Sequence, residues 1–279
     1  MLQLLDIEFH KLKHSRSSKV LAITYFVILS FIALIASIEF NFGDVQIRIA
    51  DQGIFNFPYI WHFNTWIAGI IKFFLAIVIV SMISSEYSNR TLKQNLIDGM
   101  SKKEFLLSKF LMVVAFSLFS TLFIFVLSAI LGYSFSDFTE FSIVTRDLEF
   151  LLAYFLKLVA FFSFCIFLAV LVKRSAFALG FLLIWWIIEN IIHWPILRGY
   201  FGLSEETADA AVQFFPLESM SNLINQPFTR LDFIKTAANQ LKADVAFDYA
   251  VHWYEVGIVL VWIFLFIYGS YSLLKKRDL

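Results

Sequence analysis

The sequence has 279 residues, of which 60% are hydrophobic and 19% are aromatic, and its formal net charge at pH 7 is zero. A soluble domain is nearer half apolar, so this composition excludes an ordinary soluble protein and is typical of a membrane protein. The zero net charge argues neither for nor against nucleic acid, and we expect no nucleic-acid partner. The single cysteine, Cys165, cannot form an internal disulfide, so nothing indicates an oxidising compartment.

The N-terminal residues 1–16 are predicted to form an amphipathic helix. Leu2, Leu5, Phe9 and Leu12 recur at helical spacing, with basic residues between and after them. This pattern favours a helix that lies at the membrane surface before the first span. The segment has no signal-peptide pattern.

Six apolar runs follow, and each is long enough for a helix of about 20 residues that crosses the bilayer. The predicted fold class is therefore all-α, a polytopic membrane protein with six transmembrane helices in a single domain over residues 1–279. The predicted spans are 20–38, 64–84, 106–133, 150–172, 176–196 and 253–274.

Lysine and arginine residues predict the orientation of these spans. Fourteen of the 22 flank the span ends that share a side with both termini, six flank the opposite ends, and two fall within spans. The positive-inside rule therefore places both termini in the cytoplasm. The fourteen are Lys11, Lys13, Arg16, Lys19, Arg90, Lys93, Lys102, Lys103, Lys109, Lys173, Arg174, Lys275, Lys276 and Arg277.

The longest connection, residues 198–252, precedes the last span on the predicted outer side. It mixes apolar and polar residues and contains Pro216 and Pro227. We predict short helices that lie on or dip into the outer leaflet, and no separate folded domain.

A charged segment, residues 84–109, joins the second and third spans and reads SSEYSNRTLKQNLIDGMSKKEFLLSK. Gly99 suits the end of a helix, and Ser101 with Glu104 has the spacing of a capping box that starts the next one. The pattern predicts a helix, a break, and a helix that runs into the third span. Such a segment is either a solvated connector or a surface for a cytoplasmic partner, and the residues alone weight the two about equally. Its apolar stripe consists of Leu92, Leu96, Met100 and Phe105.

This segment resembles the loop between the second and third spans of ABC type-2 permeases, the membrane subunits of ATP-binding-cassette exporters. Two positions depart from the family pattern: Met100 stands where many relatives have proline, and Arg90 where glycine is frequent. The resemblance extends over most of the chain, through the N-terminal helix, the six spans and the long outer segment. The residues that match by position are Glu86, Thr91, Leu92, Gly99, Ser101, Lys102 and Lys109.

The resemblance implies a transporter built from two permeases, which form a homodimer in the cell (inner) membrane, and two ATPase subunits. Residues 84–109, Arg90 included, are then the coupling segment that contacts the ATPase, and residues 1–16 are the connecting helix beside it. The chain has no GxxxxGK[ST] phosphate loop. We therefore expect no enzyme activity and no cofactor in this chain, with ATP and Mg bound by the partner ATPase.

Three ionisable residues fall inside the predicted spans, at a similar level in the outer half of the bilayer. Intramembrane charges are expensive unless paired or hydrated, and they are candidates for function. We predict that Glu189 pairs with Lys72 or Lys157. The alternatives are that each lysine extends to the outer interface, or that these residues contact substrate.

In the resembled family the second and fifth spans line the transport path. Here the polar residues of those spans include Asn64, Lys72, Glu189 and Asn190, while the other residues are mostly apolar, which favours a hydrophobic or amphipathic substrate. A metal site of His62, His193 and His252 is conceivable, but interfacial histidines are the better interpretation, so we predict no metal. No catalytic motif is present, which argues against an intramembrane enzyme. The alternative function is a non-transporting anchor, immunity or sensor subunit.

Overall fold

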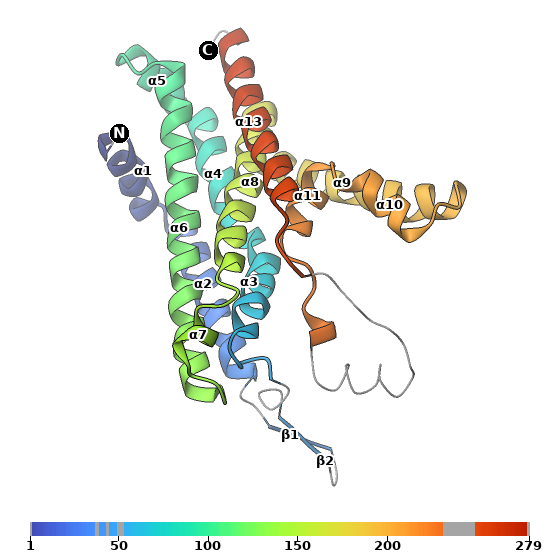
Figure 1. Ribbon diagram of the computed structural model, residues 1–279. Helices are drawn as coiled ribbons and strands as arrows, with labels where there is room; N and C mark the ends of the chain where they lie inside the picture. Colours follow the sequence, from blue (N-terminus) through green and yellow to red (C-terminus); the bar gives the residue numbers. More distant parts are fainter. Residues whose placement is uncertain (1, 37–38, 43–44, 49–52, 231–248, 278–279) are drawn as a thin grey trace.

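The computed structural model describes residues 2–36, 39–42, 45–48, 53–230 and 249–277 (Figure 1). Most of these residues form an elongated bundle of helices, with α1, α5 and both chain ends at one end of it. The helices of the first half are α1 (Leu2–His14), α2 (Arg16–Ala36), α3 (Tyr59–Ile71), α4 (Phe73–Ser88), α5 (Thr91–Ile97) and α6 (Lys102–Phe135). Those of the second half are α7 (Phe141–Val144), α8 (Glu149–Val172), α9 (Ser175–Ile191), the π-helix η2 (Ile192–Tyr200), α10 (Glu205–Val212), α11 (Pro216–Asn222), the 3-10 helix η3 (Phe228–Arg230) and α13 (Trp253–Lys276).

In the described part of the chain, four helical stretches are long and apolar enough to cross a membrane, and one bent pair of helices makes a fifth candidate. The four stretches are Lys102–Phe135, Phe141–Val172 (α7, a turn and α8), Ser175–Tyr200 (α9 and η2) and Trp253–Lys276. They agree with four of the six predicted spans. The predicted first span, 20–38, overlaps α2, but residues 37 and 38 lie outside the described residues. Six spans therefore stay a prediction.

The predicted second span, 64–84, is not one straight helix. Two helices, α3 and α4, meet at an angle of 43° across the single residue Lys72. The Nζ atom of Lys72 lies 4.6 Å from the centre of the Phe161 ring of α8, a cation–π contact. Hydropathy could not predict the bend, because both halves are equally apolar.

Helix α8 forms the centre of the bundle and packs against α3, α4, α6, α9 and α13. Its aromatic side chains, such as Phe161 and Phe164, are almost fully buried. Three hydroxyl groups join α2, α6 and α8 inside the apolar core, because buried polar groups require partners. The Tyr25 oxygen lies 2.6 Å from Ser120 Oγ and 2.7 Å from the Tyr154 oxygen.

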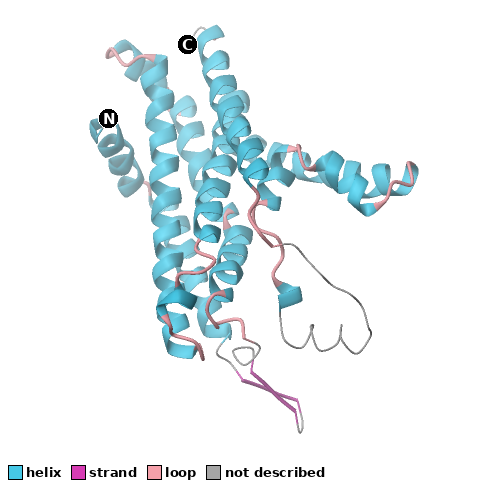
Figure 2. Cartoon of the chain, in the orientation of Figure 1, coloured by secondary structure: helices cyan, strands magenta, loops and turns pink. Residues whose placement is uncertain are grey.

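A small antiparallel hairpin is an exception to the predicted all-α fold. Strands β1 (Glu39–Phe42) and β2 (Val45–Arg48) pair with Glu39 opposite Arg48, and they extend beyond the bundle at the end opposite both termini (Figure 2). The hairpin was not predicted, because it lies in the connection between the first and second predicted spans.

The chain between α9 and α13 forms short helices as far as Arg230, and residues 231–248 lie outside the described part. Helices η2 and α10 project sideways from the bundle (Figure 1). Two contacts hold α10 against η2: His193 Nε2 lies 2.7 Å from Asp209 Oδ1, and Arg198 donates to Glu205 at 2.9 Å. The position of this segment relative to the outer leaflet stays a prediction.

Candidate functional site

The segment between α4 and α6 has the predicted order of helix, break and helix. After α4 ends, Arg90 adopts a left-handed conformation with φ 57°. Residues with a side chain rarely adopt the left-handed backbone region, whereas glycine adopts it freely. Glycine, which is frequent here in the resembled family, therefore suits this position. The chain then forms α5, whose Leu92 is buried while the next residue, Lys93, is exposed.

Local hydrogen bonds fix both sides of the break between α5 and α6. The amide of Gly99, with φ 102°, donates to the carbonyl of Leu96 at 3.3 Å, and the amide of Met100 donates to that of Asn95 at 2.9 Å. This is a Schellman motif, which uses glycine to end a helix. The predicted capping box is confirmed, because Ser101 Oγ accepts from the Glu104 amide and Glu104 accepts from the Ser101 amide.

A cluster of four charged side chains lies directly behind this segment. Glu86, at the end of α4, contacts Lys109 of α6, and Lys109 also donates to Glu8 of α1 at 2.7 Å. Lys11 of α1 donates to Glu86 at 3.0 Å and to Glu8 at 3.4 Å. We call Glu8, Lys11, Glu86 and Lys109 the charge cluster. It joins the connecting helix to the ends of two predicted spans.

The charge cluster is electrically balanced and mostly buried. Glu8, Glu86 and Lys109 are 2%, 4% and 3% exposed, while the side chain of Lys11 is 36% exposed. Burial opposes the charge on Lys11, but the carboxylates of Glu8 and Glu86 outweigh it and raise the pKa of Lys11 above its usual value. Buried charges of this kind are stable only as a complete set, because removing one leaves its partner unpaired.

Half of the charge cluster was predicted from the sequence. Glu86 and Lys109 were candidate coupling residues through the family resemblance, whereas Glu8 and Lys11 were not. A signal was present: Glu8 is an acid in a basic N-terminal segment, and it lies one helical turn before Lys11.

The other predicted coupling residues lie outside the charge cluster. Thr91 donates to the carbonyl of Glu86 at 3.4 Å, and Lys102 donates to the carbonyl of Arg277 at 2.8 Å, so Lys102 connects the segment to the C-terminal helix. The exposed surface of α5 includes Arg90, Lys93 and one large apolar side chain, Ile97, which is 75% exposed. Ile97 was not among the predicted site residues.

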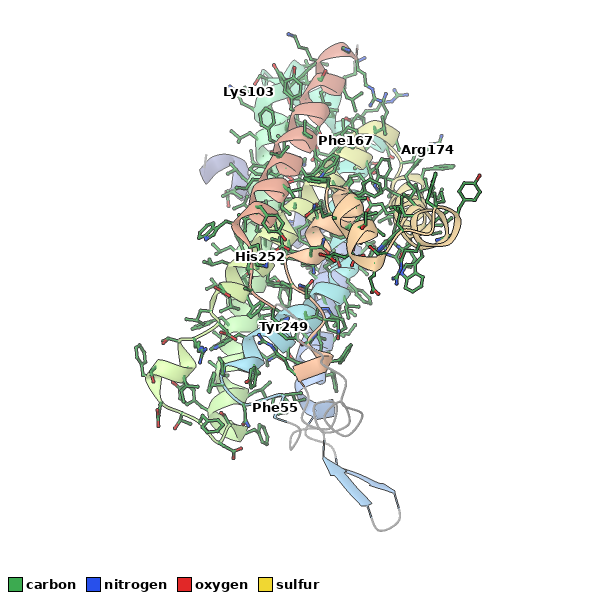
Figure 3. All side chains as sticks on the ribbon, turned by 45° about the vertical axis from the view of Figure 1, so that its right-hand side comes forward. Phe55, Lys103, Phe167, Arg174, Tyr249 and His252 are labelled. Carbon is green, nitrogen blue, oxygen red and sulfur yellow. The ribbon has the colours of Figure 1, made fainter. Side chains whose placement is uncertain are left out.

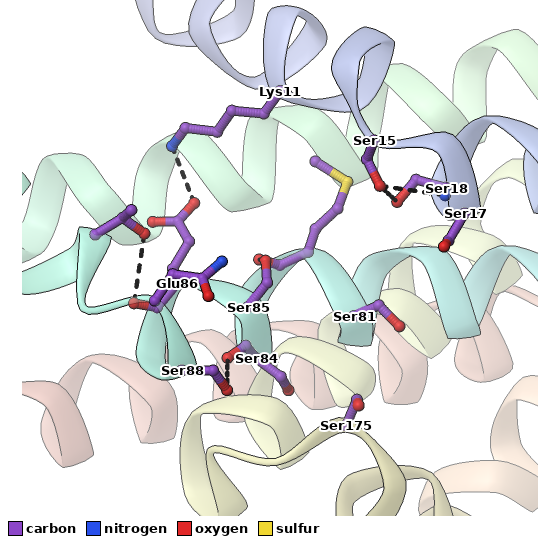
Figure 4. Close-up of a pocket in the computed structure, with 13 residues that line it drawn as sticks. Lys11, Ser15, Ser17, Ser18, Ser81, Ser84, Ser85, Glu86, Ser88 and Ser175 are labelled. Carbon is purple, nitrogen blue, oxygen red and sulfur yellow. Dashed lines mark hydrogen bonds and ion pairs between the residues drawn. The ribbon is translucent and has the colours of Figure 1, made fainter.

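A polar cavity of about 550 Å³ lies beside the charge cluster (Figure 4). Lys11 and Glu86 form part of its wall, and Asn89 and Thr91 line it as well. Met82 and eight serines complete the lining, and the serines come from the residue before α2, the start of α2, α4 and the start of α9. The serines are Ser15, Ser17, Ser18, Ser81, Ser84, Ser85, Ser88 and Ser175.

The predicted ion pair of Glu189 is wrong. Its carboxylate lies within ion-pair distance of neither Lys72 nor Lys157, and it accepts instead from the amides of Leu217 and Glu218 at the start of α11, at 3.0–3.2 Å. The indole of Trp185 donates a further bond at 2.6 Å. Helix starts carry unsatisfied amides and a partial positive charge, so they stabilise a buried carboxylate without a lysine.

The other residues predicted to lie within the membrane each have their own hydrogen-bond or ring partner. Lys157 is 5% exposed and donates to the carbonyl of Ser221 at 3.4 Å, while Lys72 contacts Phe161 as described above. Asn64 donates to Ser128 Oγ of α6 at 2.8 Å, a link between helices. Asn190 is exposed and donates to the carbonyl of Trp186 on its own helix.

The described residues contain no group of three His, Cys, Asp or Glu side chains that could hold a metal ion. The histidines named above have other contacts. His62 Nε2 lies 2.7 Å from the carbonyl of Asn225, and His193 pairs with Asp209.

Comparison with known proteins agrees with this geometry. The sequence profile of the family described as ABC-2 family transporter protein matches residues 4–189, more than half of the chain and all four members of the charge cluster. A search of curated proteins found no match. Proteins of this family are transmembrane components and not ATPases themselves. The chain belongs to the ABC-2 family of transporter proteins and is a multi-pass membrane protein.

Proposed function

We propose that the chain is the permease subunit of an ABC exporter, that it acts as a dimer, and that a separate ATPase subunit binds ATP and Mg. The observation that carries this proposal is the charge cluster behind α5. An exposed helix that stands on a rigid, buried ion network is suited to receive a force from a cytoplasmic partner and to pass it to α1, α4 and α6.

The residues of the segment divide the coupling task between them. Ile97 and Lys93, four residues apart on one exposed face of α5, are the residues we propose for the contact with the ATPase. The Schellman motif at Gly99 and the capping box at Ser101 keep α5 at a fixed angle to α6. Glu86 and Lys109 then make the ends of α4 and α6 move together.

The transport path is proposed to lie between two copies of the chain. Helix α9 supports this, because it has few buried residues and exposes a continuous apolar surface that includes Phe181, Ile184 and Ile188. A substrate with an apolar body fits this apolar surface. Helix α5 and both termini lie at one end of the bundle, and we propose that this end faces the cytoplasm. The membrane is then the inner membrane of the cell.

The test is co-purification of the tagged chain with its ATPase from native membranes, followed by measurement of ATP hydrolysis. Ile97→Asp should weaken the association at least tenfold, because it places a charge in the proposed contact. Lys276→Glu is the matched control, since Lys276 is exposed on the C-terminal helix, outside the proposed contact. If the chain purifies without an ATPase, the non-transporting anchor or sensor replaces this proposal.

A further inference from the structure

An apolar groove of about 360 Å³ runs between α6 and α13, away from the charge cluster and from the α5 surface. We call it the α6–α13 groove. Its walls are formed by apolar and aromatic side chains from both helices, with one lysine among them. They are Lys103, Leu106, Leu107 and Phe110 of α6, and Phe264, Ile267, Tyr268 and Tyr271 of α13.

The groove has a basic end and an apolar end. On α6, Lys103 comes one turn before Leu106 and two turns before Phe110, so these residues follow one face of the helix. On α13, Phe264, Tyr268 and Tyr271 follow one face in the same way, and Lys275 extends that face by one more turn. Both lysines are exposed, and both lie at the end of the bundle that holds α5.

Two further observations place the basic end of the groove. Lys102 donates to the carbonyl of Arg277, so the start of α6 and the end of α13 lie side by side. Figure 3 shows Lys103 at that end of the molecule, beside the C-terminal helix. The lysines of the two helices therefore flank the same mouth.

We propose that the α6–α13 groove binds an anionic glycerophospholipid, with its phosphate between Lys103 and Lys275 and an acyl chain along the aromatic walls. The dimensions fit. At about 1.5 Å per residue, the wall from Lys103 to Phe110 runs for about 10 Å and the wall from Lys275 to Phe264 for about 16 Å, most of the length of one acyl chain. Charged lysines at a membrane interface attract anionic headgroups, and tyrosines suit the headgroup boundary.

The lipid belongs to the leaflet beside α5, which the proposed topology makes the cytoplasmic one. The site itself does not depend on transport or on an ATPase, because every residue in it belongs to this chain. It gives the protein a preference for anionic membranes that the coupling surface does not supply.

The test is native mass spectrometry of the purified full chain in mild detergent, titrated with phosphatidylglycerol or with phosphatidylcholine of the same acyl chains. Lys103→Gln with Lys275→Gln should weaken phosphatidylglycerol binding about 25-fold, because each lysine near the interface contributes about fivefold. Phosphatidylcholine binding should change less than twofold. Lys13→Gln with Lys93→Gln is the matched control, since it removes two exposed charges at the same end of the bundle but outside the groove.

Three results would overturn the proposal. Equal binding of the two lipids by the unchanged protein would remove the role of charge. An equal loss in the groove variant and its control would show attraction by net charge alone. A groove variant that changes the oligomeric state instead of lipid binding would show that a second copy of the chain covers this face. Unfolding midpoints in phosphatidylcholine, measured for all variants, verify that each is folded.

Discussion

Replacing Lys109 with methionine removes the buried cation of the charge cluster while keeping the length of the side chain. In the structure Lys109 contacts both acids, and it lies 2.7 Å from the nearer oxygen of Glu8. Without it, two carboxylates that are at most 4% exposed share only Lys11, whose side chain is 36% exposed. The free energy of unfolding should fall by about 3 kcal/mol, near the lower end of the range for breaking a buried pair, because Lys11 still contacts both acids.

The assay is denaturant unfolding in detergent micelles, with Lys13→Met as the control. Lys13 is exposed on the same helix as Lys11, so its loss should change the free energy of unfolding by no more than about 0.5 kcal/mol. The second variant combines Lys109→Met with Glu86→Gln. It leaves Glu8 with Lys11 as a balanced pair, and it should be more stable than Lys109→Met alone.

The double variant separates an ion network from simple packing. If Lys109 acts through its charge, the two changes are not additive, because Glu86→Gln removes the acid that Lys109→Met leaves unpaired. Additive losses, or a loss for Lys109→Met no larger than that for Lys13→Met, would refute the reasoning. The proposed coupling role would then have no rigid support behind α5.

Three further predictions concern backbone geometry, titration and packing. The free energy of unfolding should be up to about 1 kcal/mol higher for Arg90→Gly than for Arg90→Ala, because glycine adopts the left-handed φ of 57° with less strain. Denaturant titration of both variants measures this difference, and a lower stability for the glycine variant contradicts the prediction. The pKa of Lys11 is raised above its usual value of 10.5, so the stabilisation from its charge is complete below about pH 10.5 and is lost as pH rises through the raised pKa. From about pH 10.5 upward the unfolding midpoint should therefore fall further for the unchanged protein than for Lys11→Met, and parallel curves would oppose the assignment. Gly132→Ala should lower the free energy of unfolding by about 1–3 kcal/mol, because the added methyl group meets the Phe57 ring. Gly257→Ala is the control, since its methyl group meets no neighbouring atom and should not lower the stability. Equal effects of the two changes in thermal melts would argue against this packing.

Much of the fold follows from patterns that are local in the sequence. Hydropathy predicts the four helical stretches that are long and apolar enough to cross a membrane, because a helix in a bilayer must be apolar along its whole length. The break between α5 and α6 is equally local, since Gly99, Ser101 and Glu104 make their hydrogen bonds within a few residues. These features need no knowledge of how the helices pack.

The failed predictions involve contacts between distant parts of the chain. Glu189 was matched to a lysine at a similar depth, on the assumption that a buried carboxylate needs a cation. Its actual partners include amides almost 30 residues further along the chain. The depth of a residue in the bilayer predicts neither where α11 begins nor that α11 packs against α9. The bend at Lys72 was missed for a related reason, because it depends on the packing of α3 and α4 against α8.

The polar groups of this chain are satisfied differently at different depths. In the middle part of the bundle, Glu189 accepts from an amide at the start of α11 and Lys157 donates to the carbonyl of Ser221 near its end, which places α11 firmly against the spans. At the end that holds α5, Glu86 and Lys109 use each other and the residues of α1. The contacts at the end that holds α5 therefore link three helices, while α11 is held by separate contacts. Under the coupling proposed above, a force on α5 is passed to α1, α4 and α6 and not directly to α11.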